Sequence, residues 1–106
     1  MAKYLLKATY TPDGAKGLLK EGGSKRRAAA EQAFQSVGGK VDAFYFAFGE
    51  TDAFVIVEAP DHAAASAASL AISAGGAVRV ETVVLLTPEE IDNAAKKSVT
   101  YRAPGQ

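Results

Sequence analysis

Four stretches of the chain carry aromatic and β-branched side chains at the density typical of β-strands. They are residues 4–10, 40–48, 52–59 and 77–86. Between the first two lies a helical pattern that Gly22-Gly23 interrupts. Between the last two lies an alanine-rich helix, which begins at Pro60-Asp61 and ends at Gly75-Gly76. The order β-α-β-β-α-β predicts an α+β domain of the ferredoxin-like βαββαβ type. Such a domain has a four-stranded antiparallel sheet with both main helices on one face.

Residues with side-chain oxygens mark where the expected helices begin. Thr11 is expected to cap the first helix, and Ser24 the piece that follows the glycine pair. The run Thr87-Pro88-Glu89-Glu90 has the form of a capping box and predicts a short C-terminal helix. We therefore expect one domain over residues 1–97 and an extended tail over residues 98–106.

Both faces of the expected sheet carry large apolar side chains. Alternation along the strands sends Phe44 and Phe46 to one side and Tyr45 to the other, and it also separates Val55 from Ile56. An antiparallel sheet with a solvated back alternates apolar with polar residues instead, and each large side chain left in water forgoes about 1.5–3 kcal/mol. We therefore expect a second copy to cover the open face, in a homodimer or a higher homo-oligomer. The alternative is that the short C-terminal helix and the tail fold over this face within one chain.

Composition narrows the partners and the chemistry. The 106 residues include 12 basic and 12 acidic side chains, and the resulting net charge of zero disfavours nucleic-acid binding, because a phosphate backbone attracts a field of one sign. The chain has no cysteine, which excludes thiol chemistry. It has one histidine, which excludes a His-rich metal centre within one protomer. We expect no metal and no cofactor. No apolar run approaches the roughly 20 residues that span a bilayer. We therefore expect a cytoplasmic chain with no membrane partner.

Several polar residues are expected to gather at one end of the sheet. Following the chain direction, Asp52 and Arg79 fall near the same end, with Lys7 one pleat inward. Charged groups on a face that a partner covers must pair or meet a ligand. We therefore take Lys7, Tyr45, Asp52 and Arg79 as candidate ligand-binding residues. The alternative is a set of plain ion pairs, Lys7–Glu81 or Arg79–Asp52.

Three cations open the second helical piece. Lys25, Arg26 and Arg27 oppose the dipole of their helix, at roughly 0.3–1 kcal/mol apiece when exposed. A bound anion would offset this cost, and the glycine pair before them leaves main-chain amides free to help. Ser24, Arg26 and Arg27 are therefore candidate anion-binding residues. The alternative is a set of exposed charges that Glu31, four residues after Arg27, relieves in part.

Four blocks of the sequence resemble the GYD-domain family, within the dimeric α+β-barrel superfamily. They are Tyr10 to Leu18, Gly22 to Arg27, Phe44 to Asp52, and Gly75 to Arg79, and the resemblance covers roughly residues 3 to 95. In the family pattern G-x-Y-D, Gly49 and Asp52 match, whereas Thr51 stands where tyrosine is expected. The resemblance implies sheets that pack face to face in a dimer. It selects no reaction, because the superfamily includes cofactor-free monooxygenases, haem-handling enzymes, isomerases and ligand-binding modules.

Three functions are compatible with these features. The preferred one is a small dimeric barrel that binds a small organic or anionic metabolite in a pocket between sheet and helices. The second is a cofactor-independent enzyme, oxygenase- or isomerase-like, with Lys7, Tyr45 or Asp52 in proton transfer. The third is a structural oligomerisation module, motivated by the apolar sheet faces alone. His62, a lone histidine in the first turn of the alanine-rich helix, is expected to be exposed and structural. Asp52 begins the strand that ends just before this helix, so the two residues are expected to lie at opposite ends of the sheet and not to form an acid–base pair within a protomer.

Overall fold

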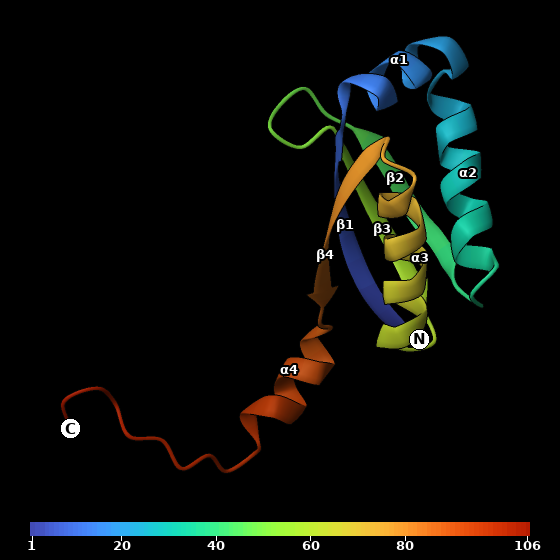
Figure 1. Ribbon diagram of the computed structural model, residues 1–106. Helices are drawn as coiled ribbons and strands as arrows, with labels where there is room; N and C mark the ends of the chain where they lie inside the picture. The colour runs from blue at the N-terminus through green and yellow to red at the C-terminus, as the bar shows by residue number, and fades with distance from the viewer.

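The computed structural model describes residues 1–106 as four strands and four helices. The elements in chain order are β1 (Ala2–Tyr10), α1 (Pro12–Glu21), α2 (Gly23–Gln35), β2 (Lys40–Phe46), β3 (Ala53–Ala59), α3 (His62–Ala74), β4 (Val78–Leu85) and α4 (Pro88–Ala95). The strands form one antiparallel sheet in the order β2-β3-β1-β4, and α2 and α3 lie against one of its faces (Figure 1). The expected ferredoxin-like fold is therefore confirmed. None of the four helices is long and apolar enough to cross a membrane.

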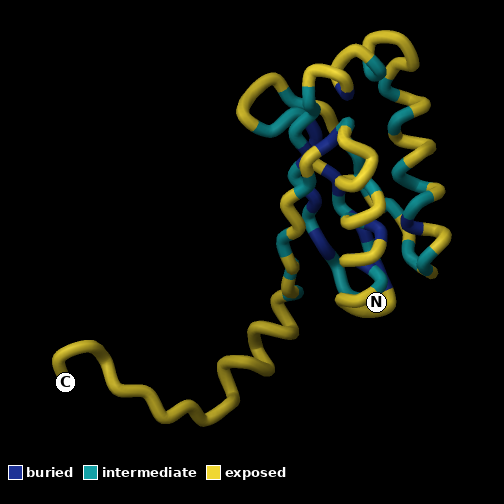
Figure 2. Tube along the Cα trace, in the orientation of Figure 1, coloured by how far each residue is buried: buried dark blue, intermediate teal, exposed yellow.

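The hydrophobic core lies between the sheet and the helices α2 and α3. Alternate residues of β1 and β3 point into it, and Tyr4 and Val57 are among the most deeply buried. Phe34 of α2 is completely buried in the same cluster, together with Ala65 and Ala68 of α3. The small alanine side chains allow α3 to lie close to the strands. Figure 2 shows that the buried positions concentrate on the strands behind these helices.

Gly14 allows α1 to lie directly against the start of β4. A Cβ at this position would overlap the main-chain oxygen of Ala77. Thr11 donates from its main-chain nitrogen to the same oxygen at 3.0 Å, and its hydroxyl accepts from the nitrogen of Gly14 at 3.1 Å. Thr11 is therefore the N-cap of α1, as expected, and the start of this helix is held to the connection between α3 and β4.

The break between α1 and α2 differs from the expectation in one detail. Gly22, with φ at 87°, ends α1 and is also the N-cap of α2, whose first residue is Gly23. Ser24 therefore lies within the first turn and forms no capping hydrogen bond, so its expected role as N-cap is wrong. The left-handed backbone conformation explains the earlier start, because glycine adopts it without steric cost.

The last helix and the tail run away from the sheet (Figure 1). The expected capping box at Thr87 is present, because its hydroxyl accepts from the nitrogen of Glu90 at 3.1 Å and Glu90 Oε1 accepts from the nitrogen of Thr87 at 3.0 Å. Every residue from Pro88 to Gln106 is exposed. The alternative in which this segment folds back over the sheet is therefore not found within the chain.

The face of the sheet opposite α2 and α3, here called the open face, is apolar at its centre. Leu5 of β1 lies between Ile56 of β3 and Val83 of β4. Towards the β2 edge, the open face presents Phe54, which is 38% exposed, and Tyr45, which is 70% exposed. The expected distribution of large apolar residues over both faces is therefore confirmed.

Candidate functional site

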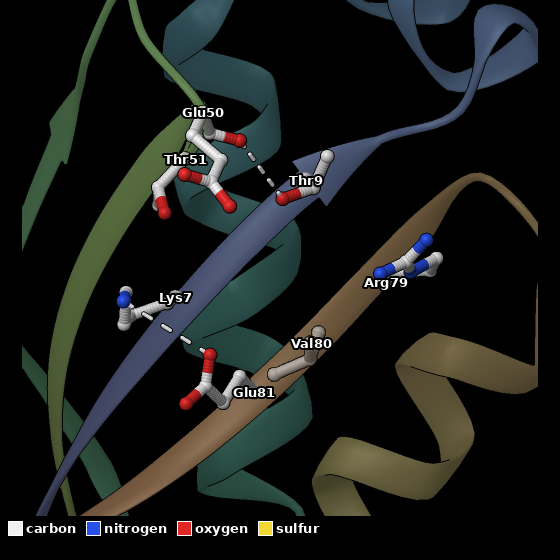
Figure 3. A pocket seen from close by; sticks show the side chains of 7 residues that line it. All are labelled: Lys7, Thr9, Glu50, Thr51, Arg79, Val80 and Glu81. Carbon is white, nitrogen blue, oxygen red and sulfur yellow. Dashed lines mark hydrogen bonds and ion pairs between the residues drawn. The ribbon is translucent and has the colours of Figure 1, made fainter.

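Two hollows open at the hairpin end of the sheet, on opposite faces. The polar hollow lies on the open face, where side chains of β1 and β4 meet the β2–β3 hairpin (Figure 3), and has a volume of about 230 Å³. The apolar pocket lies on the helix face, between α1 and the same hairpin, and has a volume of about 410 Å³. The polar hollow is lined by Lys7, Thr9, Glu50, Thr51, Arg79, Val80 and Glu81. The apolar pocket is lined by Tyr10, Ala15, Leu18, Leu19, Gly23, Phe46, Ala47, Phe48 and Asp52.

Strand register brings charged residues of β1 and β4 together in the polar hollow. Lys7 lies opposite Glu81, and Thr9 lies opposite Arg79. The Nζ atom of Lys7 is 4.0 Å from Oε2 of Glu81, so this ion pair is present but long (Figure 3). The hydroxyl of Thr9 donates to the main-chain oxygen of Glu50 at 3.3 Å, which ties the hairpin to β1.

Asp52 lies on the other side of the sheet from these residues. Its Oδ2 accepts a hydrogen bond from the main-chain nitrogen of Tyr10 at 2.8 Å, and its own nitrogen donates to the oxygen of Ala8 at 2.9 Å. The backbone pairing of β1 with β3 ends at Ala8 and Ala53, so the carboxylate satisfies the next donor of β1. Arg79 forms no ion pair within the chain, and the expected Arg79–Asp52 pair is therefore wrong.

Aromatic rings form the wall of the apolar pocket. The rings of Tyr10 and Phe46 are stacked, with their centroids 6.5 Å apart and their planes at 27°. Gly23 allows Phe46 to lie against the start of α2, since a Cβ there would stand 2.8 Å from Cε2 of the ring. Leu19 is 88% exposed and Phe48 is fully exposed, and they form the rim. The alternation of Phe46 and Phe48 is visible in the sequence, but their position opposite α1 is not.

The four candidate ligand-binding residues do not form one site. Lys7 and Arg79 line the polar hollow, Asp52 lines the apolar pocket, and Tyr45 lines neither. Tyr45 stands on β2 opposite Phe54, on the open face. The expected single pocket between sheet and helices therefore includes Asp52 alone of the four. Alternation along the strands places Lys7 and Arg79 on the face that the helices leave uncovered.

The comparison with known families agrees with this architecture. A family model described as GYD domain matches residues 4–95, which is most of the chain. The chain belongs to the GYD-domain family. No curated protein and no solved structure matches it. The hairpin segment Gly49 to Asp52 touches both hollows, because Thr51 lines the polar hollow, whereas Asp52 lines the apolar pocket.

The candidate anion-binding residues of this GYD domain separate into two places. Ser24 and Arg27 share a shallow hollow of about 250 Å³ with Gly23 of α2 and with Phe44 and Phe46 of β2. Arg26 instead lies beside a narrow space between the helices and the sheet, and its Nε is buried without a hydrogen-bond partner. Neither arginine forms an ion pair, so the expected relief by Glu31 is not found.

His62 lies at the opposite end of the GYD domain from both hollows. Its side chain is exposed at the start of α3, and its Nδ1 is 2.6 Å from the hydroxyl of the buried Tyr4. The expectation that His62 is exposed is confirmed, and so is its separation from Asp52, which lies at the other end of β3. The hydrogen bond satisfies a tyrosine hydroxyl at the edge of the core.

A cluster of charges on the open face, at the end away from the hairpin, was not expected from the sequence. The Nζ atom of Lys3 is 2.8 Å from Oδ2 of Asp42 and 3.5 Å from Oε2 of Glu58, and Lys40 is 3.2 Å from Glu58. The hydrogen bond between Lys3 and Asp42 lowers the pKa of the Asp42 carboxyl and raises the pKa of the Lys3 ammonium. The register of β2 shifts at Asp42, and the alternation rule cannot anticipate such a bulge.

Proposed function

We propose that this GYD domain is a homodimeric binding protein that holds a small organic molecule in the apolar pocket. The observation that carries the proposal is the pocket itself, with a volume of about 410 Å³, a mostly apolar lining and a single ionisable carboxylate, that of Asp52. Small-molecule sites typically have volumes of about 300–1,000 Å³ and combine apolar walls with a few polar groups. The space between α2, α3 and the sheet, by contrast, is only about 30 Å³.

The open face supports the homodimeric part of the proposal. Its apolar residues, Leu5, Ile56 and Val83 at the centre and Phe54 towards β2, have no cover from the chain itself. A second sheet packed face to face would remove this apolar surface from water, and a twofold partner presents the same surface in return. The same packing would close the polar hollow, which lies on this face.

Sedimentation velocity tests the dimer. The wild-type chain is expected to sediment as a dimer and Phe54→Asp as a monomer, because the substitution places a carboxylate within the apolar contact. Ile91→Asp is the matched control, since Ile91 is also an exposed apolar residue but lies on α4, away from the sheet. A wild-type chain that remains monomeric at high concentration contradicts this part of the proposal.

Titration with toluene, followed by the NMR shifts of main-chain amides, tests the pocket. Shifts are expected around Leu18 and Phe46, and Leu18→Trp is expected to abolish them because the larger ring fills the space. Leu70→Trp provides the control, since Leu70 is exposed on α3 and lines no part of the pocket. Absence of toluene binding to the wild-type chain contradicts the binding function whatever the oligomeric state.

A second candidate function is the binding of a small monovalent anion in the polar hollow. The observation that favours it is Arg79, a cation without an ion-pair partner, beside Lys7 and the hydroxyl of Thr9. Glu50 and Glu81 line the same hollow and disfavour multiply charged anions. Titration with acetate is expected to shift the amides of β1 and β4 in the wild-type chain and not in Arg79→Gln. Equal shifts in both chains would show that Arg79 does not bind the anion.

A further inference from the structure

We infer that the apolar pocket selects a molecule that combines a flat apolar frame with a hydrogen-bond donor, such as an amine or a hydroxyl group, and that Asp52 binds this donor. The inference rests on the proposed function, because it names the ligand class of the same pocket. It also gives Asp52 a second role beside its hydrogen bond to Tyr10.

The charge of the pocket supports this ligand class. Asp52 is the only lysine, arginine, aspartate or glutamate among the lining residues, and no cation lines the pocket to balance it. Arg26 lies beside neighbouring hollows but does not line this one. Apolar walls strengthen electrostatic interactions, because the effective dielectric constant is lower there than in water. The pocket therefore attracts a cation or a neutral donor and repels a carboxylate.

The hydrogen bonds of Asp52 show which group is free. Oδ2 is occupied by the main-chain nitrogen of Tyr10 at 2.8 Å, whereas Oδ1 forms no hydrogen bond within the chain. An ionised carboxylate only accepts hydrogen bonds, so a ligand bound to Oδ1 must donate one. The bond from Tyr10 also holds the carboxylate in place before any ligand arrives, which lowers the entropic cost of binding.

The shape of the wall supports a flat ligand. The stacked rings of Tyr10 and Phe46 lie at 27° to each other and present aromatic surface to the pocket. Aromatic ligands pack on such surfaces in offset-stacked or edge-to-face arrangements. Leu18 and Leu19 of α1 supply apolar contacts on the other side.

Asp52→Asn separates the two roles of this residue. The amide oxygen of asparagine accepts the hydrogen bond of Tyr10, as Oδ2 does in the wild-type chain. The amide nitrogen, a donor, then takes the place of the free Oδ1. The substitution therefore keeps the fold and reverses the hydrogen-bonding preference of the pocket.

Four probes with the same ring test the inference by NMR titration of the full chain: benzylamine, benzyl alcohol, acetophenone and benzoate. The wild-type chain is expected to bind benzylamine at least about tenfold more tightly than acetophenone or benzoate, as a charge-assisted hydrogen bond implies. In Asp52→Asn, the affinity for benzylamine is expected to fall at least about tenfold and that for acetophenone to rise. Asp92→Asn, on the exposed α4, is the matched control and is expected to keep the wild-type order.

The outcomes distinguish this inference from the proposed function. Equal affinities for all four probes, or tighter binding of benzoate, overturn the inference and leave a binding pocket in place. An unchanged order in Asp52→Asn also overturns it, because Asp52 is then not the group that selects the ligand. If neither toluene nor any of the four probes binds, the inference and the proposed binding function are both overturned.

Discussion

The main-chain nitrogen of Tyr10 donates a hydrogen bond to Oδ2 of Asp52 at 2.8 Å, and this bond joins the end of β1 to the residue that precedes β3. It continues the contact between the two strands past their last backbone pair, Ala8 with Ala53. It also orients the carboxylate at the apolar pocket that Tyr10 itself lines. A single bond therefore couples the end of the sheet to the candidate binding site.

Asp52→Ala is expected to lower the free energy of unfolding by about 1–3 kcal/mol, because the part-buried donor of Tyr10 loses its acceptor. Asp52→Asn keeps an acceptor and is expected to lie within about 1 kcal/mol of the wild-type value. Urea denaturation at one protein concentration measures both. Equal losses in the two variants would show that the hydrogen bond is not what Asp52 contributes.

Gly14→Ala is expected to lower the free energy of unfolding by about 1–3 kcal/mol, because the new Cβ overlaps the main-chain oxygen of Ala77 and α1 must shift. Gly17→Ala is the matched control in the same helix, since beyond its chain neighbours and the backbone of its own helix no atom lies within 4 Å of its Cβ position. Alanine is the better helix former, so this control is expected to stabilise the chain by about 0.5–1 kcal/mol. Thermal denaturation followed by circular dichroism measures both. Similar effects of the two substitutions contradict the close contact at Gly14.

Acidic pH is expected to weaken the fold through Asp42. The hydrogen bond from Lys3 lowers the pKa of this carboxyl below its usual 3.8, so its contribution to stability is fully present above that value and is lost as the pH falls below it. The stability of Asp42→Asn is therefore expected to depend less on pH in this acidic range. Urea denaturation at a series of pH values, with Asp92→Asn as the control without an ion pair, measures the difference. If the stability of Asp42→Asn falls with decreasing pH as steeply as that of the wild-type chain, Asp42 does not cause the loss of stability in acid.

Removal of residues 88–106 is expected to leave the stability of the single domain unchanged. These residues are all exposed, and α4 runs away from the sheet. The truncated and full-length chains are compared in the Phe54→Asp background, so that contacts of this segment with a second copy do not contribute to the measured stability. A loss of more than about 1 kcal/mol in urea denaturation would show contacts with the domain that the structure does not contain.

The order of the elements, several of their boundaries and the apolar character of both sheet faces followed from local patterns of residues. The caps at Thr11 and Thr87 were predictable because an N-cap depends on residues three positions apart. The separation of Val55 from Ile56 was predictable because side chains alternate along any strand. Ser24 failed as a cap because Gly22 adopts the positive φ that starts the helix earlier.

Which of the charged and polar candidate residues meet depends on how the elements pack. Asp52 and Arg79 lie at the same end of the sheet, yet they line hollows on different faces, because the Asp52 side chain turns to the main-chain nitrogen of Tyr10. The bulge at Asp42 and the apolar pocket depend in the same way on strand register and on how α1 meets the hairpin. These are contacts between residues distant in the chain, so local periodicity carries no information about them.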